Sequence, residues 1–99
     1  MNIRLSQKDI DIIKSTAIEV FGEDIDIYIF GSRVDPTRKG GDIDIMIEKD
    51  AEVDLSLELK FLALLEKRGI ERKVDIVVKT PNSKDHEIFK EAKEKGVKI

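Results

Sequence analysis

The sequence has no cysteine and no tryptophan, and its aromatic residues are one tyrosine and four phenylalanines. Without cysteine, a disulfide framework, a thiolate metal site and a thiol nucleophile are all excluded. No apolar run approaches the roughly 18 residues that a membrane span requires. The first residues carry charges where a signal peptide would have its apolar core. We therefore expect a cytoplasmic protein with no membrane association.

Neither sign of charge dominates, since 18 Lys and Arg stand against 21 Asp and Glu, for a net charge of −3. There is no basic stripe and no set of aromatic residues for stacking bases, so we do not expect direct nucleic-acid binding. A chain of 99 residues supports a single domain, residues 1–99, with one core. Such a chain leaves little room for separate substrate recognition, which favours a partner protein as the acceptor in any transfer reaction. The sequence does not decide whether the chain forms a homo-oligomer.

Hydrophobic periodicity predicts an α/β (α+β) fold, with a small mixed β-sheet flanked by helices. Helical spacing covers residues 7–21, which Ser6 would cap and Gly22 would end. Alternation of apolar and polar residues predicts strands at 25–30 and 42–48. A third strand is expected at 74–78, around Asp75, and a short final strand at 97–99. Residues 33–41 are predicted to form a loop, and a charged helix is expected at about 84–95.

A further helix, strongly apolar, is expected to begin after Asp54 and to end at Gly69. Its predicted core stripe is formed by four leucines at helical spacing: Leu55, Leu59, Leu62 and Leu65. Three further apolar residues, Leu57, Phe61 and Leu64, would widen this stripe beyond one face. An apolar surface that a small sheet does not cover indicates a protein partner.

Three acidic residues are the candidates for the chemistry. Asp42 and Asp44 lie two positions apart on a predicted strand, so their side chains leave the same face of the sheet. Asp75 is a third carboxylate, set among apolar residues of another strand. Mg²⁺ prefers oxygen ligands and commonly takes one or two carboxylates together with substrate phosphates. Three acids suit a site with two Mg²⁺ ions for phosphoryl transfer.

Gly31 and Ser32 directly follow the first predicted strand. Glycine lets the backbone approach a phosphate closely, and a helical turn beginning there would favour an anion at its free N–H groups. The alternative for the acids is a polar face of an exposed strand. Asp24 and Asp26 repeat the spacing, but they precede the Gly-Ser turn and are expected to be a solvated strand start. The single histidine, His86, is expected at the surface.

The ordered set of Gly31-Ser32, nine intervening residues and Asp42-Ile43-Asp44 resembles the signature of the DNA polymerase beta-like nucleotidyltransferases. Within that superfamily, the short chain resembles the minimal nucleotidyltransferases, the MntA-like antitoxins paired with HEPN-domain toxins. The resemblance implies that Asp42, Asp44 and Asp75 are the catalytic, metal-binding acids. It also implies that Gly31 and Ser32 hold the triphosphate and that Arg33 contacts phosphate or partner.

By this resemblance the chain is expected to transfer a nucleoside monophosphate, AMP from ATP, to a hydroxyl group of a HEPN-type toxin. The alternative is an antitoxin or scaffold without catalysis, which neutralises its partner by binding. The presence of all three acids argues against that alternative, because a vestigial site has no reason to keep clustered negative charge. The sequence departs from the family in two places: Asp35-Pro36 stands where the family has a helical turn of small residues, and Gly41 replaces the serine often found before the first Asp.

Overall fold

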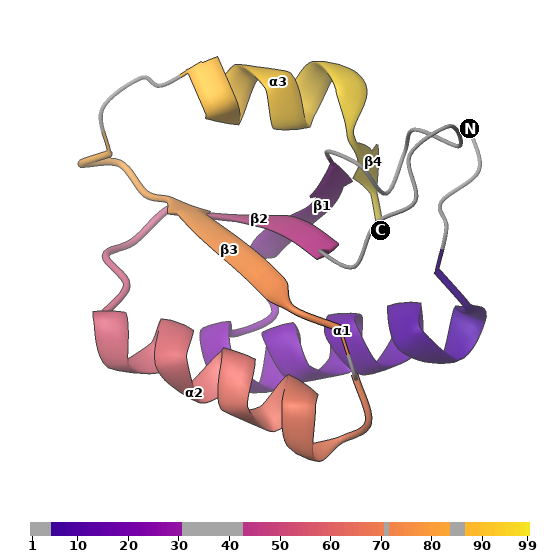
Figure 1. Cartoon of the computed structure of the whole chain (residues 1–99). Coiled ribbons are helices and arrows are strands. Elements are labelled where there is room, and N and C mark those ends of the chain that lie inside the picture. Colours follow the sequence, from indigo (N-terminus) through magenta and orange to yellow (C-terminus); the bar gives the residue numbers. More distant parts are fainter. Residues whose placement is uncertain (1–4, 31–42, 71, 84–86) are drawn as a thin grey trace.

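The computed structural model describes residues 5–30, 43–70, 72–83 and 87–99, and these form three layers (Figure 1). In chain order the elements are α1 (Gln7–Phe21), β1 (Ile25–Phe30), β2 (Ile43–Lys49), α2 (Leu55–Lys67), β3 (Val74–Lys79), α3 (Glu87–Lys95) and β4 (Val97–Lys98). The predicted fold class is confirmed: helices lie on both faces of a small mixed sheet. The predicted loop at 33–41 and the predicted start of the last helix at 84 lie outside the described residues.

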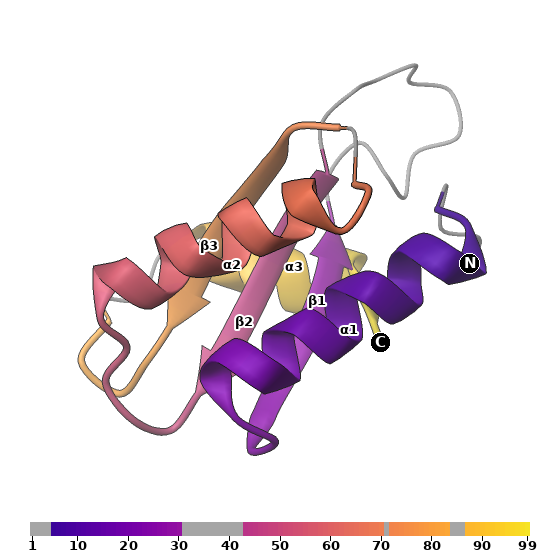
Figure 2. The ribbon, with the colours of Figure 1, turned by 90° about the horizontal axis from the view of Figure 1, so that it is seen from below.

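The four strands of the described sheet lie in the order β3-β2-β1-β4. β1 is antiparallel to both of its neighbours, whereas β2 and β3 are parallel. Parallel neighbours need a crossover connection, and α2 supplies it between β2 and β3 (Figure 2). The parallel pairing brings the beginnings of β2 and β3 to the same end of the sheet.

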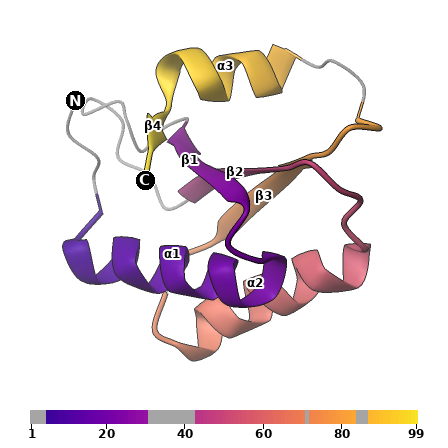
Figure 3. The same cartoon turned by 180° about the vertical axis from the view of Figure 1, so that it is seen from behind.

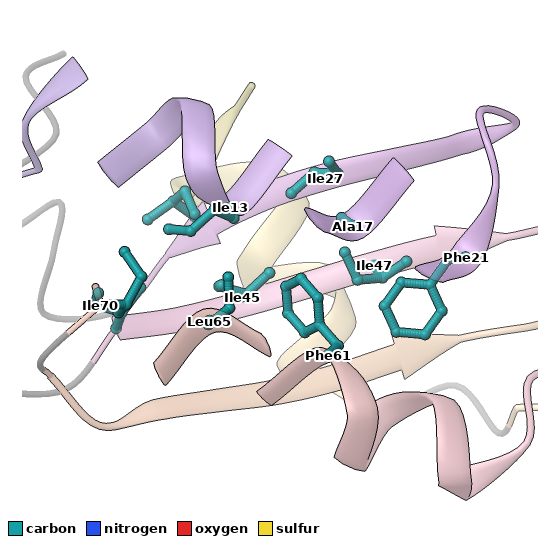
Figure 4. Packing of buried hydrophobic residues seen from close by; sticks show 11 residues of the cluster. Ile13, Ala17, Phe21, Ile27, Ile45, Ile47, Phe61, Leu65 and Ile70 are labelled. Atoms are coloured by element: carbon teal, nitrogen blue, oxygen red, sulfur yellow. The ribbon is translucent and has the colours of Figure 1, made fainter. Parts of the chain in front are cut away.

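One face of the sheet is covered by α1 and α2, and the main core lies between this face and the two helices (Figures 3 and 4). Alternation along the strands turns the isoleucines of β1 and β2 toward these helices: Ile27, Ile29, Ile43, Ile45 and Ile47. From α1 the core receives residues spaced four apart, Ile13, Ala17 and Phe21. The rings of Phe21 and Phe61 close the far end of the core, with centroids 5.4 Å apart.

The predicted core stripe of α2 is wrong at two positions. Leu55 and Leu59 are 64% and 59% exposed, whereas Phe61 and Leu65 are fully buried. Partly buried Leu57 packs against the same cluster, so the core face of the helix follows Leu57, Phe61 and Leu65. The large ring of Phe61 turns this face inward, because it fills the space beside Phe21.

The other face of the sheet is covered by α3 (Figure 1). A second, smaller cluster joins Phe30 and Met46 of the strands to Phe89 and Ala92 of the helix. Gly96 permits this close packing, since a Cβ there would lie 2.3 Å from the carbonyl oxygen of Ala92. α3 is therefore pressed against the end of β1, on the face that carries the acids of β2 and β3.

The helices begin and end at residues that suit those positions. The Ser6 hydroxyl accepts a hydrogen bond from the Asp9 N–H at 3.1 Å, as predicted for the cap of α1. Gly22 ends that helix at a φ of 100°, a conformation that favours glycine. Asp54 caps α2 by accepting from the Ser56 N–H at 3.0 Å. Within the described ranges no helix has both the length and the apolar character needed to cross a bilayer.

Candidate functional site

Asp44 and Asp75 lie side by side on neighbouring strands. The parallel register pairs Asp44 of β2 directly with Asp75 of β3. Ile43 and Ile45, on either side of Asp44, are buried against α1 and α2. Alternation therefore sends the Asp44 side chain to the opposite face of the sheet, and residues paired in register share a face. With neighbouring strands about 4.8 Å apart, the two carboxylates are close neighbours.

The acid pair lies at the end of the sheet where β1 finishes. Phe30, the last residue of β1, is the antiparallel partner of Asp44. The next residues in the chain are Gly31 and Ser32, and the following strand, β2, begins at Ile43. The predicted site residues Gly31, Ser32, Arg33 and Asp42 all lie outside the described residues, as does the single histidine, His86.

Lys73 is a residue of this region that the sequence did not single out. Its ammonium nitrogen lies 3.9 Å from a carboxylate oxygen of Asp75. Its carbonyl oxygen accepts a hydrogen bond from the N–H of Ile43 at 2.8 Å, which continues the contact between the two parallel strands. The only signal in the sequence was its position two residues before Asp75, which places both side chains on one face of an extended chain.

Asp24 and Asp26 lie at the other end of the sheet, as the sequence predicted. Asp26 is opposite Glu48 in the register of β1 and β2. Each of the two aspartates has a lysine partner, Asp24 with Lys49 at 3.2 Å and Asp26 with Lys98 at 3.1 Å. The hydrogen bond from Lys49 holds the pKa of the Asp24 carboxyl below its usual value. These acids are separated from Asp44 and Asp75 by the length of the sheet.

Glu48 is held on the α3 face by two lysines. Its carboxylate accepts from Lys93 of α3 at 2.9 Å and from Lys79 of β3 at 3.3 Å. Burial alone would raise the pKa of Glu48, but the hydrogen bonds from the two lysines outweigh it and lower the pKa. The same contact raises the pKa of Lys93. This network ties α3 to the sheet at the end away from the acid pair.

The lowered pKa of Glu48 predicts how its contribution to stability depends on pH. The carboxylate stabilises the fold above its unfolded pKa of about 4.5, and this contribution is lost as the pH falls through the lower folded pKa. We expect wild type to exceed Glu48→Gln in free energy of unfolding at pH 7, and the difference to shrink below about pH 5. Urea denaturation at several pH values measures it. Exposed Glu91→Gln is the matched control, and a difference that grows on acidification would contradict the prediction.

Asp44 and Asp75 fit a divalent cation by their chemistry. Hard cations such as Mg²⁺ take carboxylate oxygens, and two carboxylates held side by side repel each other until a cation lies between them. The described residues contain no group of three or more His, Cys, Asp or Glu placed to hold a metal. They supply two of the three predicted acids, and the third, Asp42, precedes the first residue of β2.

A comparison with protein-family models matches residues 12–99 to the family described as polymerase beta, nucleotidyltransferase. The matched span contains every described strand and the whole of the predicted set from Gly31 to Asp75. No curated protein matches the chain. With nearly all of its length covered by the family model, the chain belongs to the polymerase beta nucleotidyltransferase family.

Proposed function

We propose that this nucleotidyltransferase moves AMP from ATP to a hydroxyl group of a partner protein. The observation that carries the proposal is the in-register pair of Asp44 and Asp75, at one end of a sheet whose chain matches a nucleotidyltransferase family. Two carboxylates from strands far apart in the sequence meet there on one face. Phosphoryl-type transfer depends on positioning and on charge neutralisation, and acids that bind cations serve both.

In the proposed mechanism Asp42, Asp44 and Asp75 would hold two Mg²⁺ ions. Bound there, the ions would supply charge neutralisation for the triphosphate and would make the acceptor hydroxyl a better nucleophile. Gly31 and Ser32 hold the phosphates through backbone N–H groups and a hydroxyl, and Arg33 contacts a phosphate oxygen or the partner. Asp75 orients the acceptor hydroxyl. With the help of Asp75 the acceptor hydroxyl loses its proton and its oxygen attacks the α-phosphorus. The bond from the α-phosphorus to the bridging oxygen of the β-phosphate breaks, and pyrophosphate leaves with that oxygen.

The proposed partner is a HEPN-domain toxin, with this chain as its antitoxin. The support is the resemblance of the Gly-Ser and Asp-x-Asp arrangement to that of the minimal nucleotidyltransferases, together with the family match. Transfer of AMP would add a bulky, negatively charged group to the toxin. Such a modification changes local packing and charge at the acceptor, and that can neutralise an active site.

The test is label transfer from α-³²P-ATP with Mg²⁺ to a HEPN-domain protein encoded beside this chain. We expect label on the partner, none with γ-³²P-ATP, and pyrophosphate released in equal amount. Chelation of the divalent cation with EDTA should abolish the transfer. If the two proteins co-purify but none of the four α-labelled triphosphates transfers label, the proposal is wrong and the chain acts by binding.

A further inference from the structure

The acids on the α3 face are held very differently at the two ends of the sheet. Glu48 is 24% exposed and has two lysine partners, at 2.9 and 3.3 Å. Asp75 is 51% exposed, and its ion pair with Lys73 is longer, at 3.9 Å. Exposed ion pairs of that length contribute little to stability and are screened by salt. A cation from solution can therefore displace the lysine from Asp75 far more easily than it can reach Glu48.

The backbone of Lys73 is nevertheless fixed beside the acids. The hydrogen bond from Ile43 to its carbonyl oxygen ties Lys73 to the start of β2, directly after Asp42 in the chain. The parallel pairing of Val74 with Ile43 and of Asp75 with Asp44 holds the following residues in register. An exposed ammonium group thus extends from a fixed point of the backbone to within 3.9 Å of the Asp75 carboxylate that the proposed metal site uses.

Two neighbouring carboxylates repel each other, and the positive charge of Lys73 offsets part of that repulsion before any metal binds. Once a divalent cation neutralises the acids, the ammonium group would be repelled by it and released from Asp75. The lysine and the metal therefore compete for one carboxylate. We propose that Lys73 is the built-in counter-ion of Asp75, and that its competition with a divalent cation for this carboxylate lowers the affinity of the site for metal.

This inference rests on the proposed function, because it takes Asp44 and Asp75 to be metal ligands. The test uses Mn²⁺ alone, without nucleotide, and reads the free ion by electron paramagnetic resonance. Removing the competing cation in Lys73→Met is expected to tighten Mn²⁺ binding about two- to fivefold, the size of one exposed charge interaction. Lys73→Arg keeps the charge and should bind as wild type does. The gain in Lys73→Met should shrink at high salt.

Two control variants separate competition at Asp75 from a general change of charge. Arg72→Met removes the same charge one residue away, and its effect on Mn²⁺ affinity should be clearly smaller than that of Lys73→Met. Lys98→Met breaks a comparable ion pair with Asp26 at the other end of the same sheet, and we expect no change. Equal effects of Arg72→Met and Lys73→Met would overturn the assignment of Lys73.

The outcomes also distinguish this inference from the proposed function. If wild type binds Mn²⁺, Asp44→Asn abolishes the binding and Lys73→Met leaves the affinity unchanged or weaker, the role of Lys73 is refuted while the metal site stands. If neither wild type nor Lys73→Met binds Mn²⁺, the metal site itself is absent and both proposals fail.

Discussion

Asp44→Asn is expected to lower the rate of AMP transfer about a hundredfold or more without unfolding the protein. A metal ligand supports several kcal/mol of transition-state stabilisation, and each 1.36 kcal/mol corresponds to a factor of ten in rate. The fold should tolerate the change, because the amide has nearly the same shape and removes one of two adjacent negative charges. We therefore expect only a small change in the midpoint of thermal unfolding.

The measurement is single-turnover transfer of label from α-³²P-ATP at saturating Mg²⁺, with the unfolding midpoint recorded for the same preparations. Asp26→Asn is the matched control, since Asp26 is also a strand aspartate in an Asp-x-Asp sequence and lies at the opposite end of the sheet. It should retain transfer to within about twofold, because surface substitutions away from the site have small effects. Equal rates for wild type and folded Asp44→Asn would refute the catalytic role of this residue.

The strands β1 and β2 could be predicted because each has one strongly alternating pattern. In β2, Ile43, Ile45 and Ile47 point to the core, and the residues between them point to the other face. The face of Asp44 therefore follows from the sequence alone. The residue that lies beside Asp44 does not follow from the sequence, because alternation says nothing about which strand pairs with β2. The pairing of Asp44 with Asp75 depends on the parallel register, and that is a property of the packed sheet.

Lys73 could not be predicted from the sequence either, because the composition is rich in basic residues. The sequence contains 18 lysines and arginines, so one lysine two residues before an aspartate carries almost no signal. Only the position of β3 against β2 makes this lysine the counter-ion of a candidate site. The Gly-Ser and Asp-x-Asp arrangement could be recognised from the sequence alone, because its members follow one another in a fixed order along the chain.

The face of α2 was the error in the predicted fold, and its cause is local. Six leucines and one phenylalanine occur within the thirteen residues of this helix, so apolar residues at helical spacing can be found on more than one face. Leu55, Leu59 and Leu62 satisfy the pattern as well as Leu57, Phe61 and Leu65 do. Which face turns inward is decided by the partner surface on the sheet and α1, where Phe61 meets Phe21.

Phe61→Ala is accordingly expected to cost about 3–5 kcal/mol of unfolding free energy, whereas Leu59→Ala should change it by less than about 0.5 kcal/mol. The Phe61 side chain is fully buried and packs against Phe21, so truncation loses the transfer energy of the ring and leaves a cavity. Leu59 is 59% exposed, and alanine has the higher helix propensity. Urea denaturation of both variants, with circular dichroism as the readout, measures the two costs.

A loss of about 3–5 kcal/mol is a large part of the unfolding free energy of a small domain. Phe61→Leu therefore serves as a milder variant that should still fold. We expect it to lie between wild type and Phe61→Ala, because leucine fills only part of the space beside Phe21. A larger cost for Leu59→Ala than for Phe61→Leu would mean that the exposed leucines are covered in solution. In that case α2 would present its Leu55–Leu59 side to a bound chain, and the cost would depend on protein concentration.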